Sequence, residues 1–170
     1  MRRFALFLAF MVAAAGAPQG AHATGTATSL APLLAAREGW LNAPLSAAAV
    51  RGKVVLVDVF TFGCINCKNV VPNLRALYRK GDKGLVIVGV HSPETPYEKD
   101  RANVAENLKA QGIAWPVAID NSFAIWNAYG VDAWPTQLLF DRHGRLRRTI
   151  VGDSQDGDLD AAIKALLAET

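Results

Sequence analysis

The feature that most restricts the fold of this chain is the run GKVVLVDVF at residues 52–60. Apart from Asp58, every residue from Val54 to Phe60 is apolar, and most of them are β-branched. A strand with one face in water alternates apolar and polar residues, so a continuous apolar run favours a strand that is covered on both faces. Helices must then lie on both sides of the sheet. The sequence therefore predicts an α/β domain.

Strand and helix patterns alternate along the rest of the chain, which predicts parallel β–α–β crossovers with an antiparallel hairpin at the end. We expect a three-layer α/β/α sandwich with a mixed central sheet. Residues 37–50 are expected to add a small hairpin before the first long strand. The further strands are expected at 84–92, 115–120, 136–141 and 145–152, and the helices at 64–80, 97–111, 121–130 and 156–169.

The first residues have the pattern of an export signal. Arg2 and Arg3 precede an apolar run at residues 4–17, and the sequence AHA that ends at Ala23 suits cleavage by a signal peptidase. The apolar run is shorter than the about 20 residues that a membrane span needs. We therefore expect a cleavable signal peptide at 1–23, a flexible lead-in at 24–36 and one domain at 37–170. The protein would be periplasmic, and it would touch a membrane only if the signal were retained as an anchor.

The charge of the chain does not indicate a nucleic acid partner. The formal net charge is +3, and two of the basic residues belong to the expected signal peptide. The run RHGRLRR at residues 142–148 is basic, but no aromatic residues lie between its arginines. We expect this run to be a solvated face of the final hairpin.

Both cysteines, Cys64 and Cys67, follow directly after the strand at 52–60. A structural disulfide here is unfavoured, because closing a loop of about four residues removes chain entropy worth only about 2 kcal/mol. A structural zinc site needs four ligands. After the signal peptide only His91 and His143 could complete it, and both are expected to be loop or turn residues. A Cu(I) site with two thiolates and one histidine remains open.

A redox centre fits the position of the two cysteines best. Cys64 is expected where the strand ends and the helix begins, and there the free N–H groups and the helix dipole stabilise a thiolate. Cys67, three residues later, lies on the same face of the helix. One sulfur can then attack a disulfide and the other can resolve the mixed disulfide by exchange. This predicts a redox-active Cys64–Cys67 disulfide with no other cofactor and no metal.

The segment LVDVFTFGCINCKNVVPNL at residues 56–74 resembles the active-site segment of the thioredoxin superfamily. In that family a buried aspartate lies six residues before the first cysteine, and Asp58 matches it. A lysine follows the second cysteine directly and a proline follows it five residues later, and these are matched by Lys68 and Pro72.

A second segment, YGVDAWPTQLLFDRHGR at residues 129–145, resembles the region around the family's cis-proline and places Pro135 in that role. The likeness covers roughly residues 45–168. The CINC centre and the long middle region at 91–130 resemble the periplasmic TlpA/ResA/DsbE type and, more closely, the thioredoxin-like domain of DipZ-type membrane reductases. The resemblance implies a thioredoxin-like fold with a β-α insertion in the middle.

The resemblance implies a role for three side chains. Cys64 would be the nucleophile, and Cys67 would resolve the mixed disulfide. Asp58 is expected to have a raised pKa because burial disfavours a charged carboxylate, which suits a base that deprotonates Cys67 through a water molecule. The alternative for Asp58 is a structural carboxylate that is hydrogen-bonded to the neighbouring backbone.

Other residues are expected to act through their shape. Pro135 would face the disulfide and leave the preceding backbone free to pair with a substrate chain. Trp134 would either shape the fit of the substrate or pack in the core, and Trp126 and Tyr129 are expected to fill the core. Many thioredoxins have tryptophan directly before the first cysteine, whereas this chain has Gly63 there.

The function that the resemblance implies is an exported thiol–disulfide oxidoreductase. It would reduce disulfides of other periplasmic proteins, with cytochrome c apoproteins among the candidates, and would take electrons from a membrane donor of the DsbD/CcdA type. One alternative is a peroxiredoxin-like peroxidase, because Thr61 lies three residues before Cys64, although Val57 replaces the proline of that family. Another is a copper chaperone or binding module on the same fold.

Overall fold

The structure is a computed structural model that describes residues 26–169 of the chain. Its centre is a six-stranded sheet with the order β1–β4–β3–β2–β5–β6. β2, β3 and β4 are parallel, whereas β1, β5 and β6 run antiparallel to their neighbours, so the predicted mixed sheet is confirmed. The strands are β1 (Trp40–Leu41), β2 (Val54–Phe60), β3 (Leu85–His91), β4 (Val117–Ile119), β5 (Thr136–Phe140) and β6 (Leu146–Val151).

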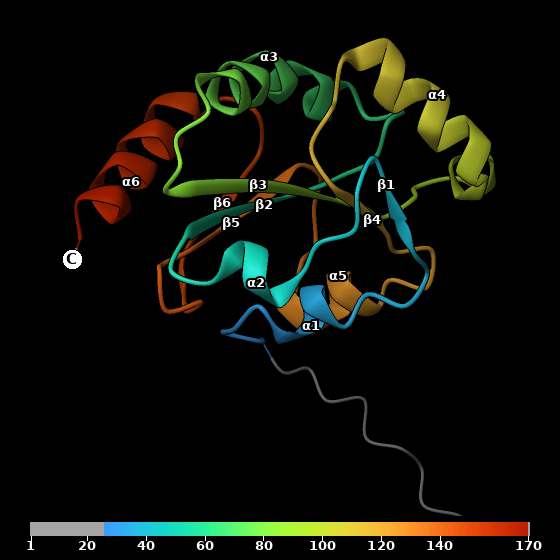
Figure 1. The fold of residues 1–170 in the computed structure, drawn as a ribbon. Helices are drawn as coiled ribbons and strands as arrows, with labels where there is room; N and C mark the ends of the chain where they lie inside the picture. The colour runs from blue at the N-terminus through green and yellow to red at the C-terminus, as the bar shows by residue number, and fades with distance from the viewer. Residues whose placement is uncertain (1–25, 170) are drawn as a thin grey trace, which may run out of the picture.

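Helices cover both faces of the sheet, as predicted. α3, α4 and α6 lie on one face, and α1, α2 and α5 lie on the other (Figure 1). The helices are α1 (Ala31–Leu34), α2 (Ala47–Val50), α3 (Ile65–Lys80), the 3-10 helix η1 (Pro96–Lys99), α4 (Arg101–Gln111), α5 (Ala124–Tyr129) and α6 (Asp156–Ala168).

The central strand β2 is buried along its whole length and contributes to two cores. Side chains alternate across a sheet. Leu56 and Phe60 therefore pack into the core beneath α3, α4 and α6, whereas Val57 and Val59 pack into the core against α1, α2 and α5. Asp58 has the same parity as Leu56 and Phe60, so its carboxyl group lies on the α3 side of the sheet.

The middle region between β3 and β5 contains η1, α4, β4 and α5. The single helix predicted at 97–111 is divided at Asp100, whose backbone is extended. The Asp100 carboxylate accepts the N–H groups of Ala102 and Asn103, and it thereby caps α4. An aspartate inside the predicted helix therefore starts a new helix.

The expected flexible lead-in is packed onto the domain. The N–H of Ala27 donates to the carbonyl of Ala128, and the carbonyl of Thr28 accepts the N–H of Leu146. Leu30 and Leu33 are buried in the core that α1 and α5 share. The expectation of flexibility is therefore wrong for residues 26–36.

The expected hairpin at residues 37–50 does not form. β1 pairs antiparallel with β4, which lies far away in the sequence. Residues 47–50 form the short helix α2, and Ser46 caps it by accepting the N–H of Ala49. This segment therefore adds an edge strand and a helix in place of a local hairpin.

The expected signal peptide at residues 1–23 lies outside the described residues. Within residues 26–169, every helix is too short or too polar to cross a bilayer.

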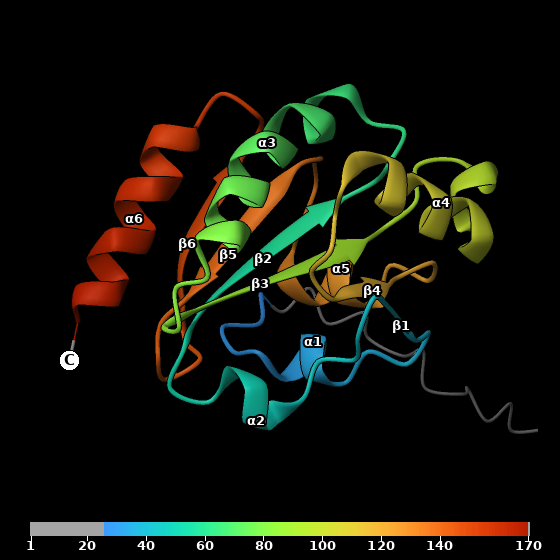
Figure 2. The same ribbon diagram turned by 45° about the horizontal axis from the view of Figure 1, so that its top comes forward.

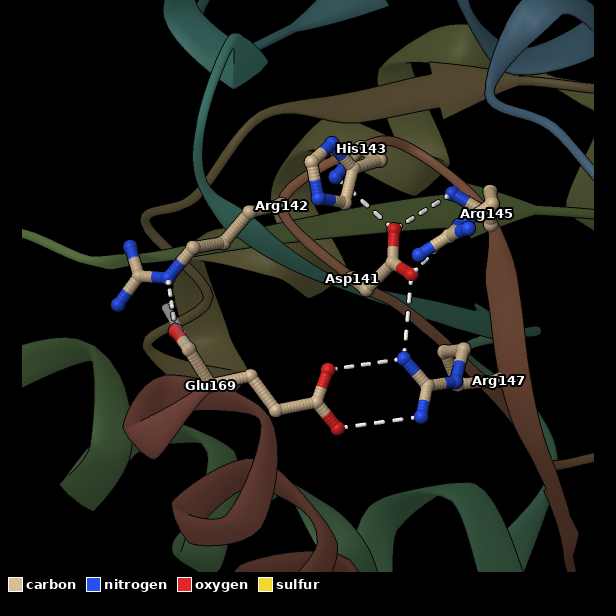
Figure 3. Close-up of polar contacts among 6 residues, drawn as sticks. All are labelled: Asp141, Arg142, His143, Arg145, Arg147 and Glu169. Carbon is tan, nitrogen blue, oxygen red and sulfur yellow. Dashed lines mark hydrogen bonds and ion pairs between the residues drawn. The ribbon is translucent and has the colours of Figure 1, made fainter.

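A cluster of charged side chains ties the hairpin of β5 and β6 to the end of α6 (Figure 3). Asp141 accepts the backbone N–H groups of His143 and Arg145, and it also pairs with the side chains of Arg145 and Arg147. Burial alone would raise the pKa of Asp141, but these hydrogen bonds lower it to about 2. Arg147 pairs in addition with Glu169. Acids of the chain itself therefore neutralise part of the basic run at 142–148.

Candidate redox site

The two cysteines lie at the start of α3, at the end of the sheet where β2 and β3 finish (Figure 2). Cys64 is the N-cap residue, and its Sγ accepts the N–H of Cys67 over 3.2 Å. Both thiols are free. The Cys64 side chain is partly exposed, whereas Cys67 is only 2% exposed. The predicted place of Cys64 at a strand-to-helix junction is confirmed, and Cys64 is the more exposed of the two cysteines.

The environment of Cys67 keeps its thiol protonated. Burial raises the pKa of Cys67 well above its usual value, and the hydrogen bond with Cys64 adds to the increase. The negative charge of Asp58 raises this pKa further, while a hydrogen bond with the backbone of Thr61 opposes the change. A shielded, protonated Cys67 beside an accessible Cys64 gives the two sulfurs different chemical properties.

Asp58 is a buried acid on the same side of the sheet as Cys67. Its side chain is 2% exposed and accepts a hydrogen bond from Gln137 Nε2 over 3.1 Å. Burial raises the pKa of Asp58 to about 7, although the hydrogen bond from Gln137 opposes the rise. This carboxyl group can therefore take up or release a proton near neutral pH. Gln137 reaches Asp58 because the two residues are directly paired between β5 and β2.

The peptide bond between Trp134 and Pro135 is cis, as the sequence led us to expect. Trp134 Nε1 donates to the carbonyl of Ser92 over 3.0 Å. Trp134 and Cys64 are both partly buried against the same core cluster. Trp126, which was expected to fill the core, is only half-buried, and its ring centre lies 4.4 Å from that of Trp134. An aromatic pair therefore borders the cis-proline.

His91 is not the loop residue that we expected. It is the last residue of β3, is fully buried and is paired in register with Phe60. Its Nε2 accepts the N–H of Phe62 over 3.4 Å and lies 3.3 Å from the Thr61 hydroxyl oxygen. Burial lowers the pKa of His91 to about 4, although the charge of Glu98 opposes this. The ring is therefore neutral at physiological pH.

His91 packs beneath the loop that leads to Cys64. Its ring is stacked on that of Phe62, with 5.4 Å between the ring centres. Because Nε2 accepts a hydrogen bond, the proton of the neutral ring lies on Nδ1. Nδ1 has no hydrogen-bond partner within the described residues.

Glu98 is a site residue that the sequence analysis missed. It is 3% exposed, and its carboxylate accepts the N–H groups of Gly63 over 2.9 Å, Glu94 over 2.8 Å and Thr95 over 2.7 Å. Burial raises the pKa of Glu98, but the hydrogen bonds from Thr61 and these N–H groups outweigh it and hold the pKa below its usual value. The capping-box pattern of Thr95 and Glu98 in the sequence could have indicated that Glu98 caps a helix start. No pattern in the sequence indicated the contact between Glu98 and Gly63.

Glu98 also explains the glycine before the first cysteine. A Cβ atom on Gly63 would lie 2.2 Å from Glu98 Oε1, which is far inside the contact distance. Any other residue at position 63 would therefore push the carboxylate away from the loop. The family's tryptophan cannot occupy this position while Glu98 is bound there.

The described residues offer few groups to a metal ion. In residues 26–169 the side chains of His, Cys, Asp and Glu form no group of three or more that could hold a metal. Nε2 of His91 accepts the N–H of Phe62 and lies 3.3 Å from the Thr61 hydroxyl oxygen. The copper site with Cys64, Cys67 and one histidine could therefore not use this nitrogen of His91 without breaking its contact with Phe62.

Comparison with known proteins gives matches over most of the chain. A family model described as Redoxin matches residues 31–166. Protein DipZ of Mycobacterium tuberculosis is 37% identical over 142 residues, which cover 81% of this chain and 20% of DipZ. The chain thus spans about a fifth of the length of that relative.

Two further proteins match along nearly their whole length. The thiol-disulfide oxidoreductase YkuV of Bacillus subtilis is 27% identical over 140 residues, which cover 82% of this chain and 95% of YkuV. The solution structure of a thioredoxin-like protein in the oxidised form superimposes with a TM-score of 0.75 at 26% identity, covering 84% of this chain and 97% of the other. The fold is therefore thioredoxin-like.

Proposed function

Because the chain belongs to the redoxin family, we propose that it is a thiol–disulfide oxidoreductase that uses Cys64 and Cys67 as its redox-active pair. The observation that carries the proposal is the contrast between the two sulfurs. Cys64 is accessible and receives an N–H hydrogen bond at the start of α3, whereas Cys67 is buried and protonated. This is the arrangement that attack and resolution by thiol–disulfide exchange require.

The reaction proceeds in two exchanges. The Cys64 thiolate attacks a substrate disulfide, forms a mixed disulfide and releases one substrate thiol. Cys67 then attacks the Cys64 sulfur, the Cys64–Cys67 disulfide forms and the second substrate thiol leaves. The substrate gains two electrons and two protons, and the cysteine pair loses them. A dithiol donor must return them before the next cycle.

Asp58 acts as the proton acceptor for Cys67. Its pKa of about 7 lets it accept a proton near neutral pH, and it lies on the α3 side of the sheet with Cys67. The charge of Asp58 also raises the pKa of Cys67, so the two groups interact. A water molecule between them carries the proton. Pro135 and Trp134 border the substrate chain at the accessible sulfur.

The partners and the compartment are also part of the proposal. We propose that the substrates are disulfides of other exported proteins and that a membrane protein of the DsbD/CcdA type supplies the electrons. The pattern at residues 1–23 supports export to the periplasm. Reduction is the favoured direction because Asp58 matches the buried acid of the reducing members of the family.

Reduction of insulin disulfides with dithiothreitol as electron donor tests the function. We expect turnover by the wild-type protein, no turnover by Cys64→Ser, and accumulation of a mixed disulfide with Cys67→Ser. Cys67→Ser keeps the nucleophile, so it serves as the matched control for folding. Undiminished turnover by Cys64→Ser would contradict the proposal.

Nothing in the site geometry favours the peroxidase alternative. The hydroxyl group of Thr61 is fully buried and lies against His91, where it cannot bind a peroxide at the Cys64 sulfur. Consumption of hydrogen peroxide at a catalytic rate would restore that alternative.

A further inference from the structure

Two exposed apolar side chains lie at the loop that carries Cys64: one follows it in the chain, and the other contacts the loop from the middle region. Within the described residues, the large apolar side chains exposed to water include Ile65 at 69% and Tyr97 at 64%. Ile65 directly follows Cys64. Tyr97 belongs to η1 in the middle region, more than thirty residues away in sequence. An exposed apolar group beside a reactive atom is a candidate contact for whatever binds there.

η1 is attached to the redox loop by two separate contacts. Glu98, the neighbour of Tyr97, accepts the N–H of Gly63, the residue before Cys64. The ring of Tyr97 itself lies edge-to-face with that of Phe62, with 6.0 Å between the ring centres. Phe62 is buried, so this contact holds the Tyr97 ring against the protein while most of the Tyr97 side chain stays exposed to water.

The backbone of the segment that carries Tyr97 is also held by helix caps. Thr95 and Glu98 form a capping box around η1, and Asp100 caps α4 directly after it. The caps hold the backbone that carries Tyr97, and its ring rests against Phe62. A preorganised aromatic ring gives a large contact area at a low cost in conformational entropy.

A protein substrate has to cover this surface. When Cys64 forms a mixed disulfide, the residues that flank the substrate cysteine come to lie over the groups around the sulfur. Burial of apolar surface stabilises such a complex, and a small disulfide has no flanking residues to bury.

We propose that Tyr97, together with Ile65, recognises polypeptide disulfides that carry an apolar side chain next to the cysteine. The proposal rests on the oxidoreductase function proposed above. It names the substrate class as an extended or unfolded polypeptide with apolar residues flanking its cysteine, and it assigns the selectivity to the η1 segment of the middle region.

The test compares two substrates in each variant. Substrate 1 is a cystine peptide with leucine beside each cysteine, and substrate 2 is the same peptide with serine in those positions. For the wild-type protein we expect kcat/KM to favour the leucine peptide. Tyr97→Ala should lower this preference about tenfold, mainly through KM, and Tyr97→Phe should restore it because the ring is retained.

Tyr78→Ala is the matched control. Tyr78 is also exposed, at 42%, but it lies near the far end of α3 and packs against Trp115. We expect this variant to keep the preference of the wild-type protein, and thermal unfolding checks that all variants are folded. Each of the following would overturn the inference: no preference in the wild-type protein, an unchanged preference in Tyr97→Ala, or equal losses with both peptides. If the wild-type protein reduces neither peptide, it is the proposed function that fails.

Discussion

At the scale of single residues, two buried groups beside the cysteines have pKa values shifted in opposite directions. Burial raises the pKa of Asp58 to about 7 and lowers that of His91 to about 4, because in both cases the charged form loses its hydration. Between about pH 4 and 6.5, folding adds a proton to Asp58 and removes one from His91. Their effects on the pH dependence of stability therefore have opposite signs and largely offset each other.

Replacing Asp58 should make the effect of His91 visible. In Asp58→Asn, the unfolded chain binds one proton more than the folded protein between about pH 4 and 6.5, so the stability rises with pH across this window. We expect an increase of about 3 kcal/mol, since each pKa unit corresponds to about 1.4 kcal/mol. Above pH 7 the variant should be more stable than the wild-type protein, because no buried carboxylate is charged. Urea unfolding at a series of pH values measures both effects.

The reciprocal variant provides the control for this prediction. His91→Gln keeps Asp58, so its stability should fall as the pH rises from about 4 to 7, the opposite slope. The comparison depends on slopes, so a uniform loss of stability from the substitution does not affect it. Equal slopes in the two variants would contradict the assigned pKa shifts.

The site residues that the sequence identified are those within a short motif. Cys64, Cys67 and Asp58 have fixed spacings along one strand and the helix after it, so local pattern was enough to place them. Gln137 and Glu98 approach this motif from distant segments, Gln137 at the strand β2 and Glu98 at the loop before Cys64. Gln137 meets Asp58 through strand register, and Glu98 meets Gly63 through the fold of η1. Spacing in the sequence carries no information about either contact.

At the scale of elements, α5 depends on one buried carboxylate. Asp120, 1% exposed, accepts the N–H of Ile125 over 2.9 Å and that of Trp126 over 3.0 Å. Asp120 also accepts a hydrogen bond from the Ser92 hydroxyl group over 2.9 Å. The backbone carbonyl of Ser92 in turn accepts a hydrogen bond from Nε1 of Trp134. The start of α5, the end of β3 and the residue before the cis-proline are therefore held together through Asp120 and Ser92.

Loss of the Asp120 carboxylate should lower the free energy of unfolding and change the environment of Trp126 and Trp134. Asp120→Ala leaves two N–H groups of α5 and the Ser92 hydroxyl without an acceptor, and we expect a loss of about 2–4 kcal/mol in the free energy of unfolding. Tryptophan fluorescence should change as well, because Trp126 and Trp134 lose their common support. Asp132→Ala, at an exposed position, is the control and should change the stability by less than about 0.5 kcal/mol. Equal stability of the two variants would contradict the role of Asp120.

Most elements could be predicted because their patterns are strong over their whole length. β2, β3, α3 and the final hairpin lie within a residue or two of their expected positions. The predicted elements were wrong in two places, one where a distant strand determines the structure and one where a helix cap within the sequence was not recognised. β1 exists because it pairs with β4, and the break between η1 and α4 follows from the cap at Asp100. Residues 37–50 contain no local signal for the pairing with β4.

At the scale of the whole molecule, the chain before β1 closes one of the two cores. Leu30 and Leu33 pack with residues of β2, β3 and α5, and the backbone of Ala27 and Thr28 is hydrogen-bonded to the rest of the domain. The domain was expected to start at residue 37, because small and polar residues predominate in the segment before it. Leu30 and Leu33, the two leucines that this segment buries, form too short an apolar pattern to predict a helix.

Leu33→Ala tests this closure. Leu33 is fully buried, so we expect the substitution to lower the free energy of unfolding by about 2–5 kcal/mol through lost burial and a new cavity. Leu34→Ala, on the neighbouring half-buried residue, should cost clearly less. Urea unfolding of the two variants gives the comparison. Equal and small losses would mean that the segment is not part of the core.

The contact between Gly63 and Glu98 limits how such proteins can be recombined. The missing side chain at one position and the buried acid at the other are complementary in shape and in hydrogen bonding, although 35 positions separate them. A chimera that received the middle region of this chain on a recipient with a bulky residue before its first cysteine would inherit a steric conflict. The two positions have to be exchanged together, and natural sequence variation at one of them should follow variation at the other.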